Sequence, residues 1–290
     1  MHFKAWLACV LVLGSSALAL ADAAINPWGA FKTAAQGEAR SIGDYSAGCV
    51  QGAHALPLHG KGYQVMHPSR ARYFGHPQLI AFVQTLGRAV QREKLGVMLL
   101  GDLSQPRGGR ASGGHASHQS GLDIDIWFWH PKRAERTPLS TQETESLKAR
   151  TVVDAKNGVI EAELKSWVTH MLRLAVADAR VERIFVHPII KRELCALPAD
   201  DRAWLHKLRP WHGHDDHFHV RLACPKDSPQ CTPQEAVGSG DGCDELDFWF
   251  SKEKRAEREQ AQKTYQSKVI TSRKWPTECD ALLENTAAPP

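Results

Sequence analysis

The chain has 290 residues, of which 42% are hydrophobic and 23% are charged. This length is enough for one large domain or two small ones with a buried core. The formal net charge is +4, and no block of basic residues is interleaved with aromatic ones, which argues against nucleic acid as a partner.

The N-terminus has the pattern of a secretion signal. Residues 1–4 form a short basic start, residues 5–13 are apolar, and small residues follow as far as Ala23. The apolar run is shorter than the roughly 20 residues that a membrane-spanning helix needs, and the small residues offer cleavage sites. We therefore assign residues 1–23 to a signal peptide cleaved near Ala23, and expect an exported, periplasmic protein without a membrane anchor.

The first half of the remaining chain contains one clear helix and two strands. Residues 24–65 are rich in Gly and Ala and are predicted to be irregular. Apolar spacing predicts a helix over residues 77–93 and a buried strand over residues 96–101. Residues 104–121 are dense in Gly and Ser, which indicates a loop, and alternation predicts a strand over residues 122–128. A long loop therefore leads directly into a strand.

The second half continues this mixture of helices and strands. Residues 131–150 are charged and poorly periodic, so we expect an excursion from the core. Helices are predicted over residues 161–178 and 203–208, and strands over residues 183–186 and 217–222. Because strands and helices do not alternate regularly, we expect an α+β fold with a central, mainly antiparallel sheet flanked by helices and disulfide-tied loops.

Six cysteines lie beyond the signal peptide, and we expect them to form three disulfides. An even number in an exported chain is typical of a disulfide framework, whereas a cysteine zinc site would need free thiolates. Nesting favours the pairs Cys224–Cys231, Cys195–Cys243 and Cys49–Cys279. The last bond would tie a charged C-terminal extension, residues 251–290, back to a domain over residues 24–250.

A first cluster of metal-ligating residue types lies where the long loop meets its strand. His115 and His118 stand in the loop, and Asp123 and Asp125 follow at the start of the strand. Asp123 and Asp125 share one face of an extended strand, and Gly121 lets the loop fold His118 back towards Asp125. Such converging nitrogen and oxygen donors suit zinc. The spacing alone is weak evidence, because loop histidines are common.

A second cluster surrounds the last predicted strand. Four of the eight residues from 212 to 219 are histidines, and His217 and His219 share one strand face. A structural zinc site is the alternative, but such sites usually have four protein ligands. A set of His118, Asp125 and His219 would leave a fourth position for water, as a hydrolase needs.

Three blocks of the sequence resemble the penicillin-insensitive murein endopeptidases, which belong with the lysostaphin-type, D-Ala-D-Ala metallopeptidase and sonic-hedgehog-like fold group. The blocks are SRARYFGHP over residues 69–77, GHASHQSGLDIDIW over residues 114–127 and HDDHFHVRL over residues 214–222. The similarity extends from about Pro27 to Leu283, and the family's three-disulfide frame implies the same cysteine pairs. Only the charged stretch around residues 252–274 lacks a clear counterpart.

The resemblance implies a zinc endopeptidase that cleaves the D-alanyl to meso-diaminopimelyl cross-link of peptidoglycan. One catalytic Zn²⁺ on the central sheet would be held by His118, Asp125 and His219, with His217 and His214 beside the open position.

A second metal position is known in some members of the family and uses a residue equivalent to His115 with a downstream acid and histidine. Asp154 is the candidate acid here, but Asn157 stands where the histidine is expected. A second ion therefore stays an open alternative.

In the mechanism that the resemblance implies, zinc polarises the scissile carbonyl and activates a water molecule. His217 is expected to take the proton of this water or to stabilise the oxyanion, with His214 as the second choice. Acids that could orient a ligating imidazole are Asp123, Asp215 and Asp216.

Substrate contacts are less well indicated by the sequence. Arg70 and Arg72 are candidates for binding a stem-peptide carboxylate in a bidentate way. Trp127, Trp129 and Trp211 flank the two motifs and could wall a cleft, although core packing is expected for at least two of them.

Three other functions remain to be weighed. A D,D-carboxypeptidase that removes terminal D-alanine would use the same ligand set. A non-catalytic, zinc-stabilised wall-binding module would not need a histidine such as His217 over the open position. A serine hydrolase is disfavoured because no G-x-S-x-G motif surrounds Ser117 or Ser120.

Overall fold

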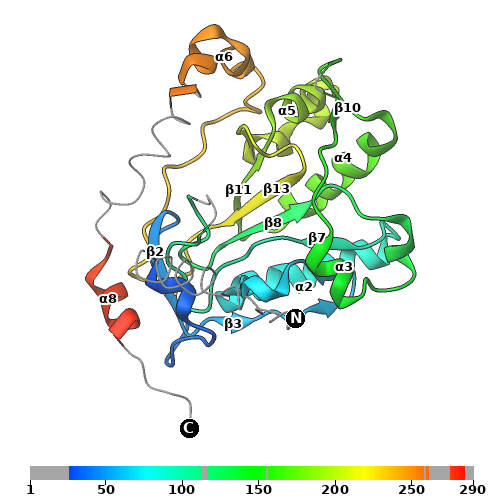
Figure 1. The fold of residues 1–290 in the computed structure, drawn as a ribbon. Helices are drawn as coiled ribbons and strands as arrows, with labels where there is room; N and C mark the ends of the chain where they lie inside the picture. Colours follow the sequence, from blue (N-terminus) through cyan, green and yellow to red (C-terminus); the bar gives the residue numbers. More distant parts are fainter. Residues whose placement is uncertain (1–25, 113–115, 155, 258, 261–274, 285–290) are drawn as a thin grey trace, which may run out of the picture.

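A seven-stranded mixed sheet forms the centre of the molecule in the computed structural model, which describes residues 26–112, 116–154, 156–257, 259–260 and 275–284. The proposed signal peptide and His115 lie outside the described residues. The strand order is β12-β11-β13-β8-β7-β5-β4 (Figure 1). In this order the strands span Leu208–Pro210, Val181–Val186, His217–Leu222, Asp123–Trp127, Met98–Leu100, Tyr63–Val65 and His59–Gly60.

The helices and strands predicted from apolar spacing are present, with ends that differ by a few residues. α2 spans Pro77–Arg92, α4 spans Ala162–Val176, and a 3-10 helix spans Ala203–Lys207. The α+β class is therefore confirmed. Shorter elements are β3 (His54–Ala55), β6 (Phe74–Gly75), α3 (Thr141–Ser146), β9 (Val153–Asp154) and β10 (Val159–Ile160).

The prediction of a mainly antiparallel sheet is wrong, because the sheet is mixed. β5 and β7 are parallel, as are β11 and β12. A helix lies between the two strands of each pair, and such a crossover brings the chain back in the same direction. The helix between β11 and β12 is α5, Pro188–Cys195, which directly follows the strand predicted over residues 183–186 and was not predicted. Proline at the first position instead begins this helix, and the His187 ring caps it by accepting from the Ile189 N–H at 3.2 Å.

Alternation along the central strands divides the sheet into an apolar and a polar face. Ile124 and Ile126 of β8 and the apolar side chains of β13 belong to the main hydrophobic cluster, together with residues of α2 and α4. Their neighbours in the strands point to the other face. Asp125 of β8 stands directly opposite His219 of β13 in the antiparallel register. Both therefore lie on the polar face, at the centre of the sheet.

A hairpin near the N-terminus packs over this polar face. β1 (Arg40–Asp44) and β2 (Ala47–Gln51) pair in antiparallel fashion, so the prediction of an irregular segment over residues 24–65 is wrong. These strands are short and rich in small residues, which hides the apolar alternation from a sequence reading. The ring of Tyr45, in the hairpin turn, lies 3.7 Å from the Arg221 guanidinium. The hairpin thus contacts β13 beside His219.

Three disulfides join Cys49 to Cys279, Cys195 to Cys243 and Cys224 to Cys231, which are the pairs expected from the sequence. The first bond attaches α8 (Thr277–Glu284) to β2 (Figure 1). The second joins the end of α5 to the segment before α6 (Leu246–Phe250). Among the described residues, no helix combines the length and the apolar character needed to cross a membrane.

Candidate metal centre

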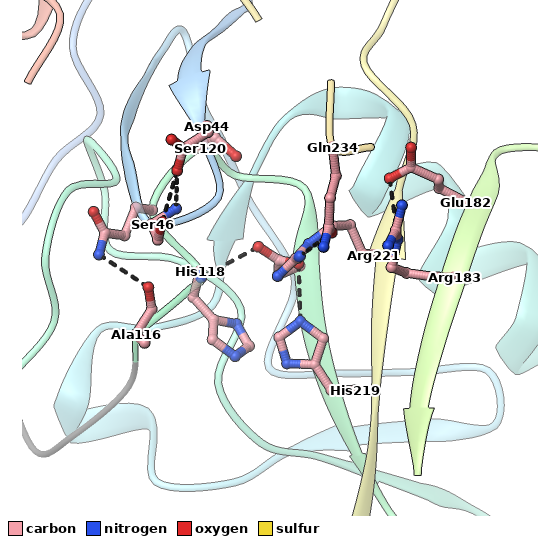
Figure 2. A network of polar contacts seen from close by, with 12 residues as sticks. Asp44, Ser46, Ala116, His118, Ser120, Glu182, Arg183, His219, Arg221 and Gln234 are labelled. Atoms are coloured by element: carbon pink, nitrogen blue, oxygen red, sulfur yellow. Dashed lines mark hydrogen bonds and ion pairs between the residues drawn. The ribbon is translucent and has the colours of Figure 1, made fainter. Parts of the chain in front are cut away.

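His118, Asp125 and His219 converge on the polar face of the sheet. The register of β8 and β13 places Asp125 beside His219. His118 comes from the loop before β8, and its ring lies beside that of His219 (Figure 2). All three side chains are buried, and one potential ligand atom of each lies within 4.8 Å of the others. Of the groups of His, Cys, Asp and Glu in the described part of the chain, this is the one arranged to hold a metal ion.

The contacts within this cluster show which atoms face the common point. The Nδ1 atom of His219 lies 3.0 Å from Asp125 Oδ1, and the Nε2 atom of His118 lies 3.3 Å from Asp125 Oδ2. Zinc binds nitrogen and oxygen ligands at about 2.0–2.1 Å, so tetrahedral ligand atoms stand roughly 3.3 Å apart. Two imidazole nitrogens and one carboxylate at these separations fit a single zinc ion.

Asp123 contacts both histidines of the cluster. Its Oδ1 atom accepts from His219 Nε2 at 2.8 Å, and its Oδ2 atom accepts the backbone N–H of His118 at 3.2 Å. Because the Nε2 hydrogen of His219 points to a carboxylate, the Nδ1 lone pair is left towards Asp125. His118 has a φ of 66°, which non-glycine residues rarely adopt. The bond from Asp123 helps to hold this backbone in place.

Gly121 completes the loop turn, as the sequence analysis expected. Its φ is 75°, and a Cβ atom at this position would lie only 3.0 Å from Val50 Cγ2. Glycine is therefore needed for both the backbone conformation and the close approach of β2.

Arg221 donates a hydrogen bond to Asp123, a role that was not predicted from the sequence. Its Nε atom donates to Asp123 Oδ1 at 2.6 Å, and its guanidinium also donates to Gln234 Oε1 at 2.5 Å. The Tyr45 ring covers the guanidinium. Arg221 is opposite Asp123 in the strand register. Its position two residues after His219 indicated only that the two side chains share a strand face.

Charges in the cluster keep its carboxylates ionised. Burial would raise the pKa of Asp125, but His118 and then His217 hold this pKa well below its usual range. Burial would also raise the pKa of Asp123, but Arg221 and His219 lower it. Conversely, burial would lower the pKa of His118, while Asp125 raises it to about 9. Two buried carboxylates therefore make this pocket attractive to a cation.

His217 lies at the edge of the cluster. Its Nε2 atom is 3.6 Å from Asp125 Oδ1, and its Nδ1–H donates to Asp216 Oδ1 at 2.5 Å. Burial alone would lower the pKa of His217, but Asp125 and Asp216 raise it. The residue can therefore hold a proton at the rim of the cluster.

His214 differs from His217 in the direction of its pKa shift. Its ring centre lies 5.0 Å from that of His217, and Nδ1 lies 3.2 Å from the backbone oxygen of His212. Since a carbonyl oxygen only accepts, Nδ1 carries the hydrogen and Nε2 keeps a lone pair. Burial, followed by the nearby His217 and His219, lowers the pKa of His214 to about 3. His214 is thus a neutral imidazole.

Comparison with known proteins identifies the family of the chain. A family model described as penicillin-insensitive murein endopeptidase matches residues 41–284. The chain belongs to this family. A Yersinia enterocolitica member is 41% identical over 285 residues, covering 97% of this chain and 98% of the relative. One from Haemophilus influenzae is 47% identical over 216 residues, 74% of each chain, and one from Escherichia coli is 41% identical over 283 residues, 97% and 98%. All three relatives are called penicillin-insensitive murein endopeptidases, so the resemblance seen in the motifs is confirmed.

The two arginines suggested for substrate binding lie around one acid in this family member. Arg72 Nη1 donates to Asp102 Oδ2 at 2.5 Å, and Arg72 also contacts Ser112. Arg70 lies 3.7 Å from Asp102 Oδ1 with a half-exposed side chain. The backbone oxygen of Asp102 accepts the N–H of Asp125 at 3.0 Å. Both arginines therefore contact the cluster only through Asp102. Arg72 has the shorter contact with Asp102.

The second metal position of the sequence analysis has no counterpart among the described residues. His115 lies outside them. Asp154 binds the side chain of Asn157 at 2.6 Å and accepts from the backbone N–H groups of Lys156 and Asn157. These bonds close a turn after β9 and make Asp154 a turn residue in this structure.

Proposed function

We propose that the protein is a zinc endopeptidase that hydrolyses the D-alanyl to meso-diaminopimelyl cross-links of peptidoglycan. The observation that carries this proposal is the buried convergence of His118, Asp125 and His219. The relatives that match nearly the whole chain are called murein endopeptidases, which indicates the substrate polymer. Three protein ligands leave a coordination position open, as is typical of catalytic rather than structural zinc sites.

His118 Nε2, His219 Nδ1 and the Asp125 carboxylate would hold the ion, because these atoms face one another across the cluster. When bound, zinc would supply the Lewis acidity that polarises a carbonyl group and acidifies a water molecule. Asp123 keeps the His219 ring in the orientation that presents Nδ1.

His217 is the residue that we assign to proton transfer. Its Nδ1–H is engaged by Asp216, so Nε2 is the atom that faces the cluster. At Nε2 it can accept the proton of the nucleophile and return it to the leaving amine, or as an imidazolium it can stabilise the oxyanion. His214, which is neutral and has its Nε2 lone pair available, is the second candidate.

Arg70 is the better of the two candidates for a stem-peptide carboxylate. Its side chain is half exposed, and its contact with Asp102 is long at 3.7 Å. We assign Arg72 to holding Asp102 beside β8, since its closest contact there is 2.5 Å.

The location and division of the chain follow from the same proposal. A murein hydrolase must reach the cell wall, and three disulfides suit an oxidising compartment such as the periplasm. We assign residues 1–23 to the signal peptide, residues 24–250 to the catalytic domain and residues 251–290 to an extension attached through Cys279.

Purified protein loaded with zinc should convert a cross-linked muropeptide dimer into two monomers, with the addition of one water in total. Mass spectrometry of the products tests this directly. Loss of a single terminal alanine would instead identify a D,D-carboxypeptidase. Binding to peptidoglycan without any product would indicate a wall-binding module.

The replacement Asp123→Asn should weaken zinc binding roughly 10- to 100-fold while the protein stays folded, because an orienting partner of a ligating histidine is lost. Competition with a fluorescent zinc chelator measures this change. Asp215→Asn is the matched control and should leave the zinc affinity unchanged. The backbone oxygen of Asp215 accepts the N–H of Val152 at 2.8 Å, and this bond does not depend on the side chain. Unchanged zinc affinity in folded Asp123→Asn would show that the carboxylate does not orient His219.

A further inference from the structure

A row of aromatic side chains extends from the candidate metal centre to α6. Phe185 of β11 stands opposite His219 in the strand register, and their ring centres are 5.4 Å apart. The ring of Trp211 lies 6.0 Å from that of Phe185, and the ring of Trp249 lies 5.9 Å from that of Trp211. Phe248 continues the row at 6.4 Å from Trp249. We call Phe185, Trp211, Trp249 and Phe248 the aromatic ledge.

The outer part of the ledge is open to solvent. Trp211 is 53% exposed and Phe248 is 47% exposed. In the described part of the chain only two other large apolar side chains are exposed, Leu58 and Phe250, and the latter lies under the Arg192 guanidinium. Exposed aromatic groups that gather in one place are typical of binding surfaces, because folding gains nothing from leaving them in water.

Polar and charged groups border the ring faces. Lys254 Nζ lies 4.6 Å from the centre of the Trp249 ring, and the His212 ring lies 5.8 Å from it. A matching ligand would therefore have an apolar face and a polar edge. Pyranose rings have this character, with C–H groups on a face and hydroxyl or amide groups around it.

The size of the ledge favours a small ligand over a second protein. An aromatic side chain buries about 150–250 Å², and the two most exposed rings have about half of this available. That area is well below the roughly 800 Å² that each partner buries in a stable protein interface. It suits one or two sugar rings.

We propose that the aromatic ledge binds an amino-sugar ring of the glycan strand that carries the cross-linked peptide. This inference rests on the proposed function, because the glycan is the part of peptidoglycan connected to the scissile bond. An extended stem peptide of about four residues spans roughly 14 Å. Two successive ring contacts of 5.4 and 6.0 Å lead from His219 to Trp211, so Trp211 lies within this span of the candidate metal centre.

Binding of glycan strands freed of their peptides tests the ledge without any need for catalysis. Titration of the mature protein should show saturable binding by tryptophan fluorescence or calorimetry. Trp211→Ala should weaken it about tenfold or more, and Trp211→Phe should retain most of it because a ring face remains. Leu58→Ala, which removes an exposed apolar side chain elsewhere, should bind like the unaltered protein. Equal binding by all four proteins would overturn the proposal.

Kinetics on two cross-linked dimers separate sugar contacts from peptide contacts. Trp211→Ala and Trp249→Ala should lower kcat/KM about tenfold on a dimer that carries its disaccharides, and less than twofold on the same dimer without sugars. Equal losses on both dimers would assign the ledge to the peptide and overturn the inference. If the unaltered protein cleaves neither dimer, the proposed function fails. The glycan titration still tests whether the ledge binds a sugar ring. Sedimentation would show whether the protein itself forms a dimer. A concentration-dependent protein dimer that the Trp211→Ala replacement prevents would assign the ledge to contact with a second copy of the chain and overturn the inference.

Discussion

Removing the metal with a chelator should lower the rate of cross-link hydrolysis by at least about 10³-fold, and stoichiometric Zn²⁺ should restore it. Lewis acidity at the reacting carbonyl has no substitute among the buried side chains of His118, Asp125 and His219. Release of monomeric muropeptides, followed by chromatography, measures the loss and the recovery. A sample treated with chelator already saturated with zinc is the control for effects of the chelator itself.

The same titration has a readout that does not depend on activity. A ligand that binds only the folded state at 1,000 times its Kd stabilises that state by about 4 kcal/mol. Zinc should therefore raise the melting temperature by several degrees, whereas Mg²⁺ should not, because magnesium prefers all-oxygen ligands. The ligand variant His219→Ala should lose the thermal shift together with activity. Full activity of verified metal-free protein would contradict the proposal.

Periodicity made the central strands predictable, and with them the pairing of residue types at the site. Asp123 and Asp125 on one strand, and His217 and His219 on another, share faces because side chains alternate. The loop histidine was harder to place, since His118 reaches the cluster only through a left-handed backbone next to Gly121. The spacing around Gly121 was only weak evidence for its place, and the resemblance to a family supported the assignment.

Features that depend on contacts between distant segments were not predictable. The function of Arg221 depends on the register that sets it opposite Asp123, and the sequence of either strand alone does not specify that register. The parallel pairs of the sheet depend on how α2 and α5 cross it. The β1–β2 hairpin is short and glycine-containing, so its local signal is weak, and its stability comes from packing on the loop before β8.

Trp127 and Trp211 occupy similar positions in the sequence but differ in their exposure to solvent. Trp127 and Trp211 both adjoin the histidine and aspartate motifs. Trp127 is buried and lies against His67, as core packing requires, whereas Trp211 stands at the rim of the polar face. Only the structure distinguishes a buried core indole from one that is exposed to solvent.

His217→Gln is expected to keep zinc and lose turnover. The side chain lies outside the set of three ligands, with Nε2 3.6 Å from Asp125 Oδ1, so zinc affinity should change less than a few-fold. Loss of a positioned proton carrier should lower kcat by about 10²- to 10⁴-fold. Stopped assays on the muropeptide dimer give kcat, and chelator competition gives the zinc affinity of the same preparation.

Three comparisons make this result specific to His217. His206→Gln, in the 3-10 helix away from the sheet's polar face, should match the unaltered protein in both measurements. Asp216→Asn should give a smaller loss of kcat, because it removes the partner of Nδ1 and leaves the imidazole in place. If His217→Gln loses zinc, the residue is a ligand and the assignment is wrong. If His214→Gln loses more turnover than His217→Gln, proton transfer belongs to His214, the neutral imidazole 5.0 Å away.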